Sequence, residues 1–308
     1  MTTAGAVRRR LFGIPSARAV FSRPGFAPQA WERFAPVARS LMEGYHAALE
    51  DPRLPALTAR LDAVEPSLTG FAYEGAGMGL AALDAVSPRK RRLDAFVAGP
   101  GAPHIYPVYV GVGLAYARLR RAPEDRLAGL DPLLGWVTAD GYGFHEAFFR
   151  RRRCVERHAV PARLSAPGRR YFDQGVGRAL WFSGGAQVDL VARLVAGFPP
   201  ARHADLWSGV GLASAYGGGA DEDALRSVLT HAPGHRRRLA RGAATAAWGR
   251  RTAGNETEHT DLACRVFCGR GSGDAAAVVA EAARDLPVIS VEPAYEIWRR
   301  RIEEALAV

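Results

Sequence analysis

The chain has 308 residues, of which 48% are hydrophobic and 23% are charged, and its 41 basic and 31 acidic residues give a formal net charge of +10. These proportions are typical of a globular protein and exclude a disordered one, and the longest uncharged apolar run, Ile105–Ala117, is too short to cross a membrane. Every basic residue except Lys90 is arginine, and no aromatic-rich segment alternates with the arginine runs, so we do not expect nucleic-acid binding.

The chain is predicted to begin with an N-terminal arm, residues 1–30. Its first segment, Met1–Gly13, holds three arginines but lacks the apolar stretch of a secretory signal, so we expect a cytoplasmic protein. An odd number of cysteines in a long chain argues against a disulfide framework. Cys264 and Cys268 share one face of a predicted helix, and we interpret them as packed apolar side chains, with half a metal site as the alternative.

Helical patterns dominate the rest of the sequence, and strand patterns are sparse. In Phe34–Glu50 the apolar residues recur every three to four positions, and the pattern stops at the following Asp51-Pro52 pair. Several arginine runs fall where helices are expected to end, a position that favours cations. We therefore predict an all-α fold. Its other periodic segments are Leu54–Val64, Gln187–Gly197, Asp221–Leu229, Ala275–Asp285 and Ala294–Leu306.

A short motif recurs along the chain, in which an aromatic residue is followed by Gly-x-Gly and then by small and apolar residues. The first glycines of its copies are Gly75, Gly111, Gly175 and Gly209, with a degenerate fifth copy at Gly242. Their spacing of about 34 residues is the size of a helical-hairpin repeat. The two pairs are offset by about 100 residues, which predicts an internal duplication with pseudo-two-fold symmetry. Its halves are residues 31–158 and 168–308, packed as one unit.

These glycines do not match a dinucleotide-binding fingerprint, because the third glycine of that motif is absent from every copy. Glycine and alanine four residues apart instead lie on one helical face, where two backbones can approach closely. A ligand lying against the exposed backbone is the alternative. It would make Gly75, Gly111, Gly175 and Gly209 substrate-binding residues.

Three residues are the candidates for acid–base catalysis. His145 could act as a general base or as a metal ligand with partners elsewhere, or it could be a histidine hydrogen-bonded within a bundle. Phe149 stands where a zincin motif would have its second histidine, so that motif is absent and we predict no metal. Glu74 and Asp173 occupy related positions in two motif copies and could face each other across the pseudo-two-fold axis as acid and base. The alternative is that each carboxylate lies at a helix start.

Aromatic and polar residues near the glycines predict a groove for a long, flat, conjugated ligand, although they would suit a hydrophobic core equally well. His104 and Tyr142 are the candidates for positioning such a ligand. No motif for a nicotinamide, flavin, haem or iron–sulfur cofactor is visible, so we predict no cofactor. The remaining candidate binding residues are Tyr106, Gln174, Trp181 and Trp207.

An ordered series of motifs covers most of the chain. The motifs are RRRLFGI at 8–14, GFAYEGAGMGL at 70–80, HIY at 104–106, DGYGFHE at 140–146, FDQGVGR at 172–178, DLWSGVGLA at 205–213 and HTDLACRV at 259–266. Together they resemble the UnbL-type enediyne biosynthesis proteins, an actinobacterial domain family of unknown function. The resemblance implies a role in natural-product biosynthesis beside a polyene-making polyketide synthase and a membrane protein similar to an electron-transport subunit. It supplies no agreed catalytic residues.

We therefore expect an accessory protein of enediyne-type polyketide biosynthesis that binds, and could modify, a polyene or polyketide intermediate in a central apolar cavity. The alternative is a non-enzymatic helical-repeat adaptor that docks the synthase or the membrane electron-transport partner. An adaptor would present a solvent-exposed groove without a buried titratable cluster. Nucleic-acid binding driven by arginine would instead show a strong dependence on salt.

Overall fold

The computed structural model describes residues 3–15, 23–287 and 292–306, and within these residues it contains helices and no β-strand. The predicted all-α fold is therefore confirmed. The α-helices in chain order are α1 (Thr3–Phe12), α3 (Ala30–Glu50), α4 (Leu54–Asp62), α5 (Pro66–Val86), α6 (Arg92–Val97), α7 (Ile105–Arg118), α8 (Val137–Phe149), α9 (Ala166–Ser183), α10 (Val188–Ala196), α11 (Pro200–Gly217), α12 (Glu222–His231), α13 (Arg236–Ala253), α14 (Glu258–Cys268), α15 (Ser272–Ala282) and α16 (Ala294–Ala305).

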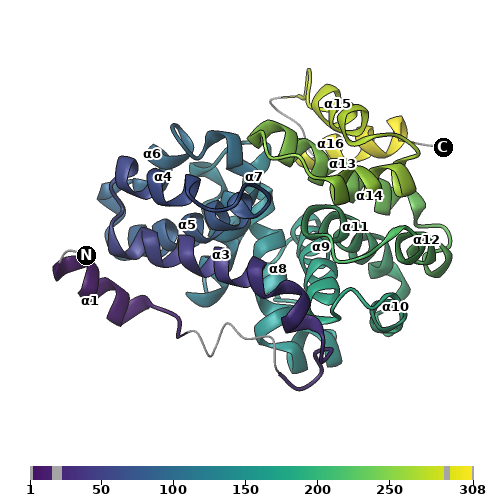
Figure 1. Cartoon of the computed structure of the whole chain (residues 1–308), viewed down its shortest axis with the longest axis horizontal. Helices are drawn as coiled ribbons and strands as arrows, with labels where there is room; N and C mark the ends of the chain where they lie inside the picture. Colours follow the sequence, from purple (N-terminus) through teal and green to yellow (C-terminus); the bar gives the residue numbers. More distant parts are fainter. Residues whose placement is uncertain (1–2, 16–22, 288–291, 307–308) are drawn as a thin grey trace.

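The core of the fold is a series of long helices, α3, α5, α7, α8, α9, α11 and α13, each of which packs against the next in chain order (Figure 1). The series also closes on itself, because α3 contacts α9. Ala27, just before α3, donates its backbone N–H to the carbonyl of Ser183 at 2.8 Å, and the rings of Phe34 and Phe182 meet edge-on with centroids 4.8 Å apart. Helices α3, α5, α7, α8 and α9 therefore surround a common space.

Glycines join each neighbouring pair of these helices through a reciprocal contact. Between α5 and α7, a Cβ atom on Gly111 would lie well under 3.0 Å from the carbonyl oxygen of Glu74, and one on Gly77 would also lie under 3.0 Å from the carbonyl oxygen of Val108. In both cases the oxygen belongs to the residue three positions before the partner glycine. The same exchange recurs in all six neighbouring pairs. The other glycine pairs are 44/75, 113/141, 143/175, 177/209 and 211/242.

The two glycines of one Gly-x-Gly motif serve opposite neighbours, because residues two apart on a helix point about 200° apart. On α5, Gly75 faces α3 and Gly77 faces α7. The close-packing interpretation of the first glycines is therefore confirmed. The role of the second glycine, which contacts the following helix, was not predicted.

Helix α8 carries a further copy of the Gly-x-Gly motif, within the DGYGFHE segment at residues 140–146. Gly141 contacts the backbone of α7 and Gly143 contacts that of α9. The first glycines therefore recur at 75, 111, 141, 175, 209 and 242, so each unit of 30 to 36 residues contains one long helix and its connection. A uniform series of such units produces an offset near 100 residues without any further event. The internal duplication and its two halves accordingly stay predictions.

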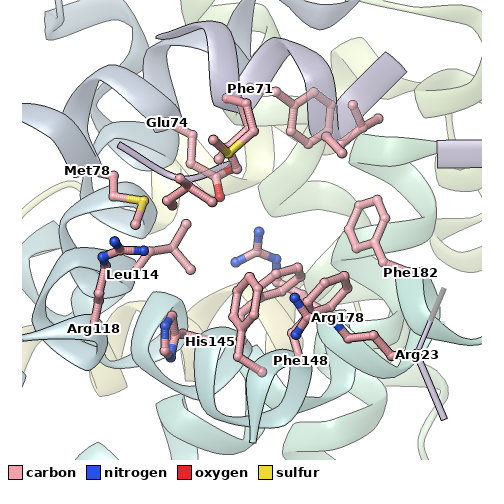
Figure 2. A pocket seen from close by; sticks show the side chains of 17 residues that line it. Arg23, Phe71, Glu74, Met78, Leu114, Arg118, His145, Phe148, Arg178 and Phe182 are labelled. Atoms are coloured by element: carbon pink, nitrogen blue, oxygen red, sulfur yellow. The ribbon is translucent and has the colours of Figure 1, made fainter. Parts of the chain in front are cut away.

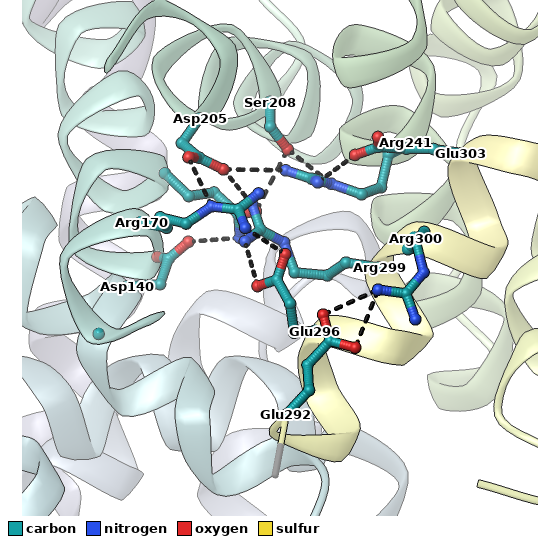
Figure 3. A network of polar contacts seen from close by, with 12 residues as sticks. Asp140, Arg170, Asp205, Ser208, Arg241, Glu292, Glu296, Arg299, Arg300 and Glu303 are labelled. Carbon is teal, nitrogen blue, oxygen red and sulfur yellow. Dashed lines mark hydrogen bonds and ion pairs between the residues drawn. The ribbon is translucent and has the colours of Figure 1, made fainter. Parts of the chain in front are cut away.

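Helix α16 is attached to the body by a buried network of charged side chains (Figure 3). Arg299 on α16 donates to the Asp205 carboxylate on α11 at 2.5 Å, and Arg170 and Arg241 lie within 3.3 and 3.5 Å of the same group. Burial alone would raise the pKa of Asp205, but the three guanidinium groups lower it to about 2. The carboxylate is therefore ionised at neutral pH and holds three elements together.

The expected position of the arginine runs at helix ends is correct for only part of the chain. Arg8–Arg10 lies at the end of α1, but Arg236–Arg238 begins α13, where a helix dipole disfavours positive charge. Arg238 is compensated there by Glu303 of α16 at 2.7 Å. Arg299 lies in the middle of α16 and is buried. Ion pairs between distant segments thus place these arginines.

Candidate functional site

The space enclosed by α3, α5, α7, α8 and α9 contains a cavity of about 210 Å³, which we call the central pocket (Figure 2). Its walls are mainly apolar. Phe144 and Phe148 stack with centroids 5.3 Å apart, and Phe182 meets Phe144 edge-on at 5.9 Å, which makes one wall aromatic. The other apolar wall residues are Ile14, Val37, Ala38, Leu41, Met42, Phe71, Met78, Leu114 and Phe149.

The glycine repeat places the side chains of the pocket. In four successive core helices the residue after the second glycine lines it: Met78, Leu114, Phe144 and Arg178. The residue four positions later lies on the same helical face, and Arg118, Phe148 and Phe182 line the pocket in this way. The polar member of the first set, Arg178, therefore points into an otherwise apolar face. The register of the repeat was the sequence signal that could have identified these residues.

Glu74 is the carboxyl group of the pocket, and its side chain is only 3% exposed. Within the described part of the chain it makes no hydrogen bond or ion pair. Burial raises the pKa of Glu74 from 4.5 to about 7; Arg178 opposes this rise and Asp140 adds to it. The group is therefore poised to gain or lose a proton near neutral pH.

Arg178 forms the charged part of the pocket floor. It is ion-paired with Asp140, whose other oxygen accepts a 2.8 Å hydrogen bond from the amide of Gln174. Its Nε is buried and has no hydrogen-bond partner among the described residues, and its guanidinium lies 5.3 Å from the centroid of the Phe144 ring. Although burial alone would lower the pKa of Arg178, Asp140 and Glu74 raise it. The floor therefore keeps one permanent positive charge beside Glu74.

His145 lies in the wall of the same pocket and is 8% exposed. Burial lowers the pKa of His145 more than the adjacent Glu146 raises it, so the ring is neutral at pH 7. Its Nδ1 lies 3.6 Å from a Glu146 oxygen, too far for a good hydrogen bond, and Glu146 is paired with Arg150 at 3.0 Å. The structure thus brings two of the three predicted acid–base residues, His145 and Glu74, to one cavity.

We expect Glu74→Gln to change how stability depends on pH. The folded-state pKa of Glu74, about 7, exceeds the ordinary 4.5. The contribution of Glu74 to stability is therefore fully present below pH 4.5 and is lost as the pH rises through 7. Since one pKa unit corresponds to about 1.4 kcal/mol, the variant should be more stable by up to about 3 kcal/mol at pH 8 and equally stable at pH 4.5. Urea denaturation at both pH values measures this, and a difference independent of pH would contradict it.

Asp173, the third predicted acid–base residue, does not line the pocket. It lies five residues before Arg178 on α9, about 140° around the helix, and points toward α11. There it pairs with Arg202, whose Nε donates to the carboxylate at 2.9 Å. Burial raises the pKa of Asp173 to about 6 against the effect of Arg202. The prediction that Glu74 and Asp173 face each other is therefore wrong, since Glu74 lines the central pocket and Asp173 pairs with Arg202.

The predicted ligand-positioning residues lie outside the central pocket. His104 stacks on Tyr73 with ring centroids 3.8 Å apart, Trp207 is buried in the core, and Trp181 donates its indole N–H to the carbonyl of Gly218 at 3.0 Å. These side chains pack between helices, as the alternative of a hydrophobic core predicted. Tyr142 lines a different cleft.

Gln174 and Tyr106 lie behind the pocket floor. Gln174 donates to Asp140 at 2.8 Å and lies 3.3 Å from the Tyr106 hydroxyl, so both belong to the support of Arg178.

The four predicted substrate-binding glycines also need correction. Helix backbone occupies the space where the ligand was expected, because a Cβ atom at any of them would clash with a carbonyl oxygen. They are Gly75, Gly111, Gly175 and Gly209.

The opening of the pocket carries two further arginines. Arg118 is exposed, and its Nη2 lies 3.4 Å from the carbonyl oxygen of Phe12. The guanidinium of Arg23 lies 4.7 Å from the centroid of the Phe149 ring, and Phe149 is 42% exposed. The pocket is therefore apolar inside, with a titratable carboxyl at its floor and positive charge at its entrance.

Residues 3–306 match the model of a family described as "Protein of unknown function (DUF1702)". No curated protein and no solved structure matches the chain. Among the helices of the described residues, none combines the length and apolar character that a membrane crossing requires. Within the same residues, no three His, Cys, Asp or Glu side chains are grouped so that they could hold a metal ion.

Proposed function

We propose that this chain, which belongs to the family of proteins of unknown function DUF1702, binds the apolar chain of a polyene or polyketide intermediate in the central pocket and acts on it through Glu74. The observation that carries the proposal is a buried carboxyl that has no hydrogen-bond or ion-pair partner among the described residues and lies at the floor of an aromatic-lined cavity. A site that only packed the fold would leave such a group paired or replaced by an apolar residue.

The shape and chemistry of the pocket support a flat, apolar ligand. The faces of Phe144, Phe148 and Phe182 offer surfaces on which a conjugated chain can stack. An apolar cavity of about 150 Å³ holds benzene. A cavity of about 210 Å³ would thus enclose a segment of roughly eight to ten carbon atoms. A longer chain would extend through the opening past Arg118.

Proton transfer is the chemistry that these residues support. With a pKa near 7, Glu74 can give a proton to one position of the bound chain and take one from another, which moves a double bond without any co-reactant. Arg178 stabilises the carboxylate while the proton is on the ligand, and the neutral His145 ring is a second proton acceptor in the same cavity. The series of motifs from residue 8 to residue 266 supports assigning this chemistry to enediyne-type polyketide biosynthesis in the cytoplasm.

Filling the pocket should abolish polyene binding. We expect Ala38→Phe, and independently Leu114→Phe, to weaken binding of a conjugated tetraene fatty acid at least tenfold, because both side chains line the cavity. The fluorescence of such a tetraene rises in an apolar site, so a titration measures the affinity directly. Ala95→Phe, at an exposed position of α6, is the control and should bind like the wild-type protein. Unchanged affinity in both pocket variants would refute the proposed binding site.

Catalysis is separated from binding in a strain that makes the product. Glu74→Ala and His145→Ala proteins should fold and bind the tetraene, but strains carrying them should lose the product and accumulate the unconverted intermediate. If both variants sustain normal production, these two residues are not catalytic. Preserved polyene binding together with normal production would instead favour a carrier. If the protein binds no polyene and the variants lose no product, the adaptor is favoured.

A further inference from the structure

A second concavity lies near the C-terminal ends of α7 and α8, and its lining is strongly basic. Arg120, Arg150, Arg153 and Arg163 line it together with the aromatic ring of Tyr142, and its volume is about 600 Å³. These residues come from the segment after α7, from α8, from the turn after α8 and from the segment before α9. We call this surface the arginine cleft. No Asp or Glu belongs to its described lining.

The positive charge of the arginine cleft is only partly compensated by the protein. Glu146 pairs with Arg150 at 3.0 Å, whereas Arg120, Arg153 and Arg163 form no ion pair with any described residue. The buried Arg241 shares the carboxylates of Asp205 and Glu303, whereas Arg120, Arg153 and Arg163 are exposed. Three guanidinium charges in the cleft therefore have no carboxylate partner among the described residues.

Helix ends account for part of this charge. Helices α7 and α8 both end at the cleft, one just before Arg120 and the other just before Arg150. Each C-terminus carries the equivalent of about half a negative charge. Two such ends offset about one of the three unpaired charges, so about two positive charges stay uncompensated. A phosphate monoester carries roughly −1.5 to −2 at pH 7.

Tyr142 adds a hydrogen-bond donor to the charged wall. Burial raises the pKa of Tyr142, and Glu146 adds to the rise, while Arg150, Arg153 and Arg163 oppose it. The charges of these three guanidinium groups therefore all act on one hydroxyl. The hydroxyl stays protonated at neutral pH and can donate to an anion. Planar guanidinium groups bind phosphate oxygens in pairs, which suits a compact anion held between several arginines.

We propose that the arginine cleft is a binding site for a phosphate group, carried by a small molecule as a monoester or pyrophosphate. The concave shape favours a small phosphate over a flat lipid surface, although a lipid headgroup presents the same chemistry. The site is distinct from the central pocket, because the linings of the two share no residue. Its existence does not depend on the function proposed for the pocket.

Calorimetric titration of the full chain with inorganic phosphate and with pyrophosphate tests this proposal. We expect saturable binding, tighter for pyrophosphate, that weakens at least tenfold in the double variant Arg153→Gln/Arg163→Gln. The matched control is Arg236→Gln/Arg237→Gln, which removes two exposed arginines without ion pairs among the described residues and lowers the net charge equally. The control should bind like the wild-type protein. Tyr142→Phe should weaken binding severalfold without affecting the fold.

Three results would overturn the proposal. One is the absence of saturable binding, and another is an equal loss in the two double variants, which would show that only the overall charge matters. The third is binding to vesicles containing phosphatidic acid without binding to either soluble anion, which would identify a membrane-facing surface instead. Binding to both vesicles and pyrophosphate, lost only in the cleft variant, would support the shared phosphate chemistry.

Discussion

Gly175→Ala is expected to destabilise the protein by at least about 3 kcal/mol, even though alanine is the better helix former. The added Cβ would lie well under 3.0 Å from the carbonyl oxygen of Asp140 and from the backbone nitrogen of Phe144. Neither atom can move alone, because both belong to the backbone of α8. Helices α8 and α9 would have to separate, which would also disturb the pocket wall formed by Phe144. Urea denaturation followed by circular dichroism gives the change in unfolding free energy.

The matched control for Gly175→Ala is Gly249→Ala. Gly249 also lies inside a helix, α13, but a Cβ there would meet nothing within 4 Å. The variant should therefore gain about 0.5–1 kcal/mol from the lower backbone entropy of the unfolded chain. Opposite signs at the two positions would establish that helix contact, and not helix propensity, requires the glycine. A mild effect of similar size at both would contradict this explanation of the repeat.

Arg178→Met is expected to cost about 3–5 kcal/mol of stability. It leaves Asp140, which is fully buried, with the Gln174 amide as its hydrogen-bond partner and removes the positive charge beside Glu74. An uncompensated buried carboxylate is costly because the interior cannot replace its hydration. The double variant Arg178→Met/Asp140→Leu should recover most of the loss, since no charge is then left alone. Chemical denaturation of the single and double variants forms the thermodynamic cycle.

Arg226→Met provides the matched control for Arg178→Met. Arg226 pairs with Glu222 across one turn of α12, but both side chains are largely exposed. Its loss should change stability by no more than about 0.5 kcal/mol, because water already screens the pair. If Arg178→Met proved equally mild, the ion pair with Asp140 would not be the support of the pocket floor.

Helix type and location could be predicted from the sequence because they depend on local patterns. The apolar spacing of Phe34–Glu50 becomes part of α3, and Asp221 caps α12 by accepting the N–H of Ala224 at 2.9 Å. The recurring small residues also predicted close helix contact, since glycine four residues from a small residue marks a face where backbones can meet. These features require information from only one or two turns of helix.

Of the acid–base candidates, Glu74 was predicted from its position in a motif copy and His145 as a histidine that could act as a general base. Their meeting in one cavity required the ring of α3, α5, α7, α8 and α9, which no local pattern encodes. The copy at Gly141 was missed because Asp140 precedes its first glycine and His145 stands where other copies have a small residue, so the segment does not resemble a packing motif. Once that copy is included, the pocket-facing positions follow from the repeat itself.

Other assignments depended on which partner a side chain meets. Asp173 is of a residue type that can act as an acid or base, yet its position on α9 directs its side chain to Arg202. Arg178 is of a residue type that usually lies at the surface, yet its side chain lines the pocket together with Glu74. The physical reason is that a sequence pattern gives the face of a helix on which a residue lies, whereas its charge state and role depend on the groups that other helices bring within a few ångströms.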